Sequence, residues 1–138
     1  MSRRIQPFQT LSLPAEVDAL APDMSEIRVL LSTHAGSMAH GTLPPGATSL
    51  AVRHRTVEEI WYVLGGEADI WRQQGDQEEV IRARAGVSLT IPLGTAFQFR
   101  TVGDEPFRFV MITMPPWPGS DECENTDGFW PQTTAAIP

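Results

Sequence analysis

The sequence predicts an all-β domain, built as an antiparallel sandwich or barrel. From residue 26 to residue 114, short runs of β-branched and aromatic residues alternate with Gly, Pro and charged turns. Almost no helical periodicity separates these runs. The length of 138 residues is enough for one hydrophobic core and too short for two, and 41% apolar with 20% charged residues is an ordinary globular balance.

The chain begins with an arm, residues 1–24, in which Pro7, Pro14 and Pro22 exclude a long helix. A short helical turn around Ala15–Leu20 is the only helix that this arm predicts. The strands follow in order, and we expect them at residues 26–32, 38–43, 48–54, 59–65, 67–73, 78–83, 87–92, 96–101 and 106–114.

Turn residues separate these strands. Pro44-Pro45-Gly46 sets a rigid corner, because proline fixes φ and glycine adopts positive φ without strain. Gly65-Gly66 lets the chain reverse into the next strand. Pro92-Leu93-Gly94 forms another corner, after which alternation places Phe97, Phe99 and Thr101 on one face and Gln98 and Arg100 on the other, at the surface.

Composition excludes several classes of function. The formal charge of −7 argues against binding to nucleic acid or to an anionic membrane, because both need a basic patch. Cys123 is the single cysteine, so an intrachain disulfide and a cysteine-rich zinc site are excluded. Its acidic neighbours disfavour the thiolate, which makes it a poor nucleophile. No apolar run approaches the roughly 18–20 residues of a membrane span, and we expect a cytoplasmic protein.

One stretch, residues 46–66, carries most of the candidate chemistry. It contains Gly46, His54, Glu59 and Gly66, with Val52 two residues before the histidine. Val52 and His54 share one face of a strand, and Glu59 begins the next strand after a short turn. This spacing brings an imidazole and a carboxylate together at the end of a barrel.

A second glycine-proline pattern follows, with Gly86, Pro92 and Gly94, then Phe97 and Thr101. The two patterns resemble the two motifs of the cupin superfamily, over roughly residues 38–114. The resemblance implies a double-stranded β-helix, or jelly roll. It also places metal-binding histidines where this chain has Val52 and Phe97, and an asparagine where it has Thr101.

Proline spacing and composition, together with the resemblance, predict an N-terminal arm (1–24), a cupin barrel (25–115) and a Pro-rich, acidic tail (116–138), one domain in all. The tail contains Trp117, Phe129 and Trp130, which we expect to cover an open end or an outer sheet of the barrel, or to reach a second subunit. Residues 132–138 are predicted to be disordered. A homodimer is expected from the resemblance, and pairing between subunits would protect the edge strands.

Cupin metal sites use three histidines and one glutamate, and Val52 and Phe97 offer no donor atoms. The sequence therefore favours no metal and no other cofactor. The alternative is a divalent metal held by a reduced set, His40, His54 and Glu59, of the kind that supports iron chemistry.

Three functions remain open. The first is a small-molecule-binding cupin without the three-histidine metal centre, its pocket lined by six residues: Val52, His54, Glu59, Trp61, Phe97 and Phe99. The second is an isomerase-like enzyme that acts on a sugar or on a small hydroxy or keto acid, with His54 and Glu59 as acid and base. The third is a dioxygenase-like metalloenzyme with the reduced ligand set. The first is the reading we favour.

Overall fold

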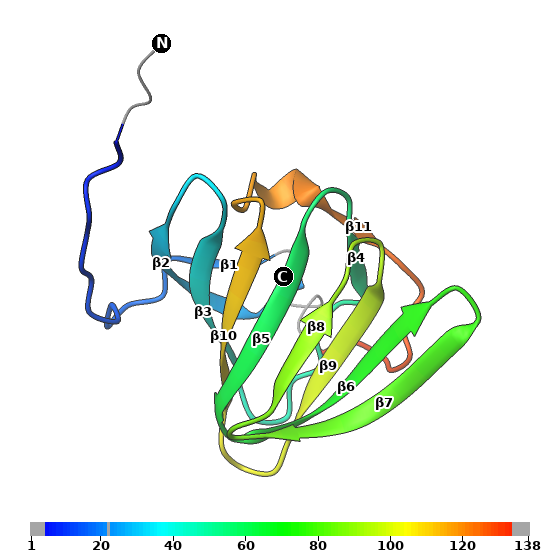
Figure 1. Cartoon of the computed structure of the whole chain (residues 1–138). Coiled ribbons are helices and arrows are strands. Elements are labelled where there is room, and N and C mark those ends of the chain that lie inside the picture. Colours follow the sequence, from blue (N-terminus) through cyan, green and yellow to red (C-terminus); the bar gives the residue numbers. More distant parts are fainter. Residues whose placement is uncertain (1–4, 22, 134–138) are drawn as a thin grey trace.

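The computed structural model describes residues 5–21 and 23–133. Over these residues the chain forms two antiparallel sheets that wrap around one apolar core (Figure 1). The larger sheet has six strands, in the spatial order β1 (Ala19–Leu20), β2 (Glu26–Ser32), β3 (Ser37–Leu43), β10 (Phe107–Met114), β5 (Glu58–Gly65) and β8 (Ser88–Ile91). The predicted all-β, double-stranded β-helix class is confirmed.

The smaller sheet has five strands, in the order β11 (Cys123–Asn125), β4 (Val52–His54), β9 (Ala96–Val102), β6 (Glu67–Gln74) and β7 (Gln77–Arg84). A single turn of 3-10 helix, Ser120–Glu122, precedes β11. β4 therefore lies between a strand from the middle of the chain and a strand from its tail. This position brings residues of the tail into contact with His54.

Most predicted strands match observed strands to within one residue at each end, and the predicted strand at 48–54 is the exception. Only Val52–His54 is regular strand, because the backbone before it bonds elsewhere. The Ser49 amide donates to Phe99 O, and the Leu50 amide donates to the carbonyl of Asp23. Thr48 forms an isolated bridge with Arg100.

Gly66 shows why the double glycine is needed between β5 and β6. Its φ of 71° lies in the left-handed region, and a Cβ there would lie 2.2 Å from the carbonyl oxygen of Pro106. Any other residue would combine backbone strain with a backbone clash. The reversal predicted at this point is therefore built on backbone packing between two turns.

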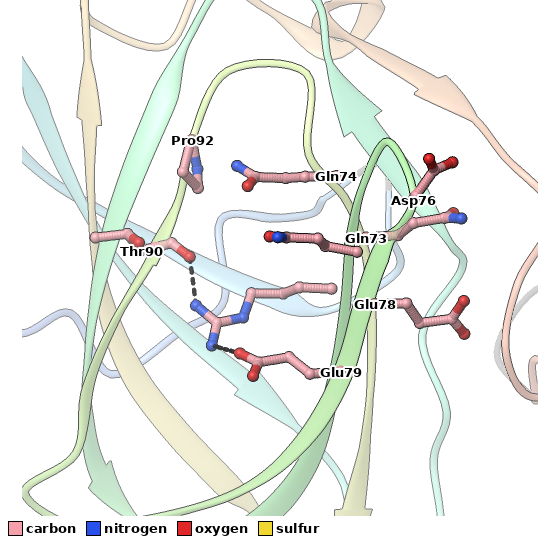
Figure 2. Close-up of a pocket in the computed structure, with 9 residues that line it drawn as sticks. Gln73, Gln74, Asp76, Glu78, Glu79, Thr90 and Pro92 are labelled. Carbon is pink, nitrogen blue, oxygen red and sulfur yellow. Dashed lines mark hydrogen bonds and ion pairs between the residues drawn. The ribbon is translucent and has the colours of Figure 1, made fainter.

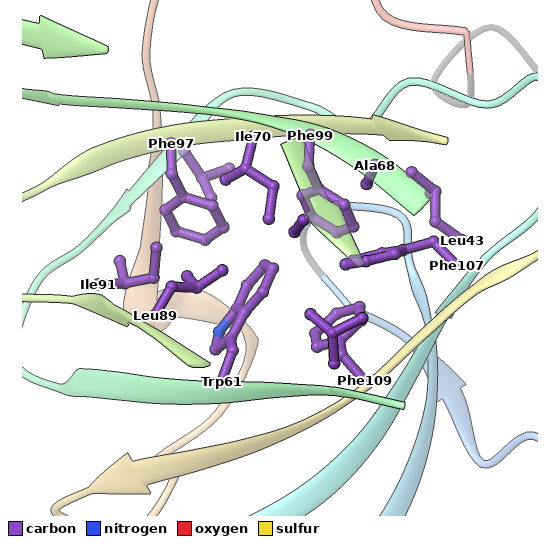
Figure 3. Packing of buried hydrophobic residues seen from close by; sticks show 13 residues of the cluster. Leu43, Trp61, Ala68, Ile70, Leu89, Ile91, Phe97, Phe99, Phe107 and Phe109 are labelled. Atoms are coloured by element: carbon purple, nitrogen blue, oxygen red, sulfur yellow. The ribbon is translucent and has the colours of Figure 1, made fainter. Parts of the chain in front are cut away.

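The core is dominated by aromatic rings from β5, β9 and β10 (Figure 3). Trp61 stacks on Phe109 with 4.2 Å between ring centroids, and Phe97 and Phe99 meet its ring edge to face at 5.8 and 5.1 Å. Such offset and T-shaped contacts stabilise a core beyond the area they bury. The barrel interior is therefore filled by side chains at this level.

The tail lies over the smaller sheet. Gln98 points to the outer face of β9 as predicted, but it is 1% exposed instead of lying at the surface. Its amide nitrogen donates to Ser49 O and Trp130 O, and its amide oxygen accepts from the backbone amides of Phe129 and Trp130. A buried amide needs such partners, and here the tail supplies three of the four.

The arm differs from the sequence prediction at one point. Residues 15–20 form no helical turn; they contain a bend and then β1, which pairs with β2. Asp18 accepts from the amide of Val29, and Arg28 donates to the carbonyls of Pro14 and Ala15. These bonds hold the segment extended.

The division into arm, barrel and tail stays a prediction, and Pro22 and residues 134–138 lie outside the described residues. Within the part of the chain that the structure describes, no helix is long and apolar enough to cross a membrane.

Candidate functional site

His54 and Glu59 face each other at one end of the barrel. His54 is the last residue of β4, the chain reverses through residues 55–57, and Glu59 is the second residue of β5. Strand alternation turns Glu59 inward while Glu58 stays exposed. The Nε2 atom of His54 lies 3.3 Å from Oε2 of Glu59, and the two side chains are 4% and 3% exposed. The structure therefore brings together the two residues that the sequence singles out as acid and base.

Trp61 fixes the carboxylate of Glu59. Its indole Nε1–H donates to Oε1 of Glu59 at 2.8 Å, two residues along the same face of β5. The other carboxylate oxygen, Oε2, is thereby left facing His54. Trp61 is itself held among the core aromatics, so the carboxylate has a rigid support.

Cys123 meets the other side of the imidazole. β11 pairs with β4 in antiparallel register, with Cys123 opposite His54, and Cys123 Sγ lies 3.4 Å from His54 Nδ1. Burial, followed by the nearby carboxylates Asp23, Glu59 and Glu122, raises the pKa of the Cys123 thiol. Because the thiol keeps its proton, it can donate to Nδ1, which leaves the imidazole proton on Nε2, facing Glu59.

The imidazole of His54 lies between two aromatic rings. Phe97 from β9 lies 5.3 Å away between ring centroids, and Trp117 from the tail lies 5.5 Å away, almost perpendicular. Phe97 is 1% exposed, whereas Trp117 is 36% exposed. Trp117 therefore covers the site on the side that faces solvent.

Glu122 anchors the tail next to the site. Its Oε2 accepts from the backbone amides of Thr56 and Val57 at 2.6 and 2.9 Å, and its Oε1 accepts from the Thr56 hydroxyl at 2.5 Å. Burial alone would raise the pKa of this carboxyl. The hydrogen bonds from Thr56 and Val57 outweigh burial and hold the pKa below its usual range. Glu122 is thus an ionised, buried cap on the turn between His54 and Glu59.

Asp23 is a buried carboxyl group that the sequence analysis missed. Its Oδ1 accepts from the Ser25 amide at 3.0 Å and the Ser25 hydroxyl at 2.6 Å, and its carbonyl accepts from the Leu50 amide. Met24 between them adopts a φ of 77°. Burial raises the pKa of Asp23 by more than the hydrogen bonds from Ser25 lower it. Glu59 and His54 are also close enough to act on this pKa, Glu59 by raising it and His54 by lowering it. The sequence signal for this turn is the Asp-x-Ser pattern, in which an aspartate side chain accepts from the backbone amide two residues later.

The other predicted pocket residues lie in the core. Val52, Trp61, Phe97 and Phe99 are each at most 1% exposed and pack against one another. The structure brings them together as expected, but as a packed layer beneath His54 and Glu59 instead of the walls of an open space. A ligand would therefore meet His54, Glu59 and Trp117 before it met these four.

His40 does not join the site, which corrects the reduced metal set. In β3 it pairs directly with Arg28 and with Val110, which in turn pairs with Tyr62. Paired residues of antiparallel strands point to the same face, and Tyr62 is 51% exposed on the outer side. Burial, with Arg28 and Arg108 nearby, lowers the pKa of His40. A ligand set of His40, His54 and Glu59 is therefore not assembled.

The donor atoms at the site do not fit the usual cupin metal centre. Of the two imidazole nitrogens of His54, one faces Cys123 and the other faces Glu59. Val52 and Phe97 contribute only carbon at the positions of two histidines. Among the described residues, no group of three or more His, Cys, Asp and Glu side chains is placed to hold a metal ion.

Other concave regions lie away from His54. A polar cleft of about 540 Å³ lies between the β6–β7 hairpin and Thr90 and Pro92. Figure 2 shows side chains that line it. Arg72 spans it, with one guanidinium nitrogen donating to Thr90 O at 2.8 Å and the other to Glu79 at 2.7 Å. A second, mostly apolar groove of about 560 Å³ lies between the arm and residues of β2, β3 and β10. Neither contains a residue of the candidate site.

Comparison with solved structures finds related folds at low identity. An uncharacterized conserved protein from Klebsiella pneumoniae with a double-stranded β-helix domain is 23% identical, with a TM-score of 0.60 over 75% of this chain and 85% of that one. A predicted oxalate decarboxylase from Thermotoga maritima is also 23% identical, with a TM-score of 0.57 over 66% of this chain and 80% of its own.

An oxalate decarboxylase of Bacillus subtilis is 21% identical with a TM-score of 0.61, over 67% of this chain but only 26% of the enzyme. The chain thus spans about a quarter of that enzyme's length. These likenesses show the fold.

Sequence comparison gives the family. The uncharacterized protein MJ1618 of Methanocaldococcus jannaschii is 29% identical over 118 residues, which is 79% of this chain and 91% of that protein. Residues 39–113 match the family model described as a cupin domain. This match covers more than half of the chain and both glycine-proline patterns, and it shows that the protein belongs to the cupin family.

Proposed function

We propose that this cupin binds a small molecule at the His54–Glu59 pair and that it works without the three-histidine metal centre. The observation that carries the proposal is the 3.3 Å contact between a buried imidazole and a buried carboxylate at the end of an otherwise aromatic barrel. Their proximity and chemistry suit a ligand that both donates and accepts hydrogen bonds.

The energetic cost of the pair supports a functional role. Burying an imidazole and a carboxylate costs desolvation energy, and well-packed apolar residues in their place are often neutral or stabilising. His54 Nε2 also lacks a hydrogen bond of good geometry among the described residues. A ligand oxygen could complete it. Buried ionisable groups that lie side by side, as these do, cluster at functional sites.

Access to the pair would run past Trp117. It is the most exposed of the side chains that touch His54, and it lies on the tail between Pro115-Pro116 and Pro118. A ligand that reaches Nε2 must displace this indole or share its place. Ligand binding should therefore change the environment of Trp117.

A second candidate function is acid–base catalysis at the same pair. Glu59 is held by Trp61 and faces the protonated nitrogen of His54. In an isomerisation of a hydroxy ketone or hydroxy aldehyde, a carboxylate can remove the proton from carbon while an imidazole protonates the oxygen. Both groups are restored when the carboxyl group returns its proton to the neighbouring carbon and the imidazole takes the proton from the hydroxyl group on the first carbon. The dioxygenase alternative loses its support, because His40 points away.

The test of binding compares four proteins. We expect a panel of sugars, hydroxy acids and keto acids, oxalate included because two fold neighbours are named for it, to contain a ligand that shifts the melting temperature of the wild type. His54→Ala and Glu59→Gln should each weaken its binding by about tenfold or more, as measured by titration calorimetry. Glu58→Gln, the adjacent exposed carboxylate, should bind like the wild type.

Equal affinity in all four proteins would refute the site. Product formation followed by NMR separates the two functions: turnover that is abolished in His54→Ala supports the isomerase, and binding without turnover supports a binding protein. The cytoplasmic location stays a prediction.

We also propose a homodimer that forms through the outer face of the six-stranded sheet. Three neighbouring apolar side chains of β5, Ile60, Tyr62 and Leu64, are 37–51% exposed there, and Met38 of β3 is 40% exposed on the same face. The arm adds Phe8, which is fully exposed. Apolar patches of this kind on a soluble domain mark interaction surfaces.

Light scattering after gel filtration tests the dimer. We expect the wild type at twice the 15.2 kDa chain mass and Tyr62→Glu at the monomer mass, because a charge would be buried without a partner. Val80→Glu changes a comparably exposed apolar residue on β7, in the other sheet, and should stay dimeric. A monomeric wild type, or a dimeric Tyr62→Glu, would contradict the proposal.

A further inference from the structure

The charges around the candidate site restrict the ligand that it can accept. Three carboxyl groups surround His54: Asp23, Glu59 and Glu122, which are 8%, 3% and 3% exposed. Each approaches from a different segment, the turn before β2, the start of β5 and the tail. Buried charges are poorly screened by solvent, so their sum acts strongly on anything that enters.

The hydrogen bonds around the site favour a negative sum. Glu122 is held ionised by three hydrogen-bond donors, and Glu59 accepts from Trp61 and faces His54. Two carboxylates, Glu59 and Glu122, thus lie near one imidazole, and the buried carboxyl group of Asp23 adds no positive charge.

Among the residues that the structure describes, no arginine side chain pairs with any of these three carboxyl groups. All ten basic side chains of the sequence are arginines. Of the eight that the structure describes, six are held by other partners: Arg28 by the carbonyls of Pro14 and Ala15, Arg55 by Asp121 O and Glu124, Arg72 by Thr90 O and Glu79, Arg82 by Asp69 and Glu67, Arg84 by Glu67, and Arg100 by Asp69.

The other two described arginines point elsewhere. Arg53 precedes His54 in β4, so strand alternation turns it to the opposite face, where it lines a shallow surface region with Glu124 and Asp127. Arg108 lies on the outer face of β10, with its guanidinium beside Gly65. Among the described residues, a carboxylate ligand would not find the bidentate arginine that usually receives it.

We infer that the ligand of the His54–Glu59 site is a neutral polyhydroxy compound or an amine, and not a carboxylate anion such as oxalate. The inference rests on the proposed small-molecule function and narrows it. Hydroxyl groups can donate to Glu59 and accept from His54 Nε2–H, and an ammonium group is attracted by the surplus negative charge. The carboxylates thus exclude the substrate class for which two of the fold neighbours are named.

Ligands of equal shape and different charge test the inference. D-gluconate, D-glucitol and D-glucamine share one six-carbon skeleton, and succinate, butane-1,4-diol and butane-1,4-diamine share a four-carbon skeleton. Ligand-observed NMR and calorimetry on the full chain should rank the neutral or amine member of a set above the carboxylate by about tenfold or more.

Glu59→Gln removes one charge at nearly constant shape and should narrow that gap by about tenfold, while Glu58→Gln should leave it unchanged. Circular dichroism checks that each variant is folded. If Glu59→Gln does not fold, Asp23→Asn, which keeps an acceptor for Ser25, takes its place.

The outcomes are separate. A carboxylate that binds the wild type more tightly than its neutral and amine counterparts overturns the inference and leaves the proposed function standing. Failure of all six probes to bind counts against the proposed function and removes the inference with it. If the wild type prefers the neutral or amine ligand of a set, and Glu59→Gln but not Glu58→Gln weakens that preference, the result supports both the proposed function and the inference about ligand charge.

Discussion

Trp61→Ala should lower the free energy of unfolding by about 3–5 kcal/mol, in the range found for large-to-small changes in cores. Trp61 is 1% exposed, and its ring contacts Phe109, Phe97 and Phe99. Alanine would leave a cavity at the centre of the barrel. It would also remove the Nε1–H donor that Glu59 accepts from, so a buried carboxylate would lose its hydrogen bond.

Two variants separate these contributions. Trp61→Phe keeps an aromatic ring but lacks the donor, and we expect it to cost about 1–3 kcal/mol. Trp117→Ala makes the same chemical change at a residue that is 36% exposed, and it should cost about 1 kcal/mol or less. Urea unfolding followed by far-ultraviolet circular dichroism, at one protein concentration, gives the three values. A loss in Trp117→Ala as large as that in Trp61→Ala would contradict the central role of Trp61.

The fold could be predicted from the sequence because its determinants are local. Strand alternation and punctuation by Gly and Pro depend on neighbours in the chain, so the strand at 26–32 and the corner at Gly46 emerge without tertiary information. The proximity of His54 and Glu59 could also be predicted from local sequence, because one short turn joins their strands. These are short-range consequences of a period of two.

The rest of the site depends on contacts between distant segments. Cys123 and Trp117 reach His54 from more than sixty positions along the chain. The sequence predicts Gln98 at the surface because alternation gives the face of a strand but not which segment covers that face; here the tail covers it. Asp23 comes from the turn before β2, and its carbonyl accepts the amide of Leu50, a residue far along the chain. Proline-rich segments carry no periodicity from which such docking could be predicted.

Glu122→Gln should lower the free energy of unfolding by about 2–3 kcal/mol near neutral pH. Oε2 of Glu122 accepts two backbone amides and Oε1 accepts the Thr56 hydroxyl, so both oxygens are in use and the side chain is 3% exposed. Glutamine must turn an NH₂ group toward one of these donors. At least one buried donor of the turn between β4 and β5 would then be unsatisfied.

The loss should depend on pH in a definite direction. The folded-state pKa of Glu122 is lowered from 4.5, so between the folded and unfolded pKa values the unfolded chain binds more protons, and stability rises with pH. The contribution of Glu122 is complete above the unfolded pKa and is lost as the pH falls through the folded one. The free energy of unfolding should therefore differ more between wild type and Glu122→Gln at about pH 7 than at about pH 3.

Two comparisons make this result specific. Asp23 has the opposite linkage, because its raised pKa makes its contribution disappear as the pH rises; both proteins contain Asp23, so its effect cancels in their difference. Glu124→Gln alters a carboxylate two residues along the tail that is 46% exposed and pairs with Arg55 at 3.5 Å, and it should cost at most about 0.5 kcal/mol at either pH. If Glu122→Gln cost the same at both pH values, the ionised carboxylate would not be what holds the tail against the turn between His54 and Glu59.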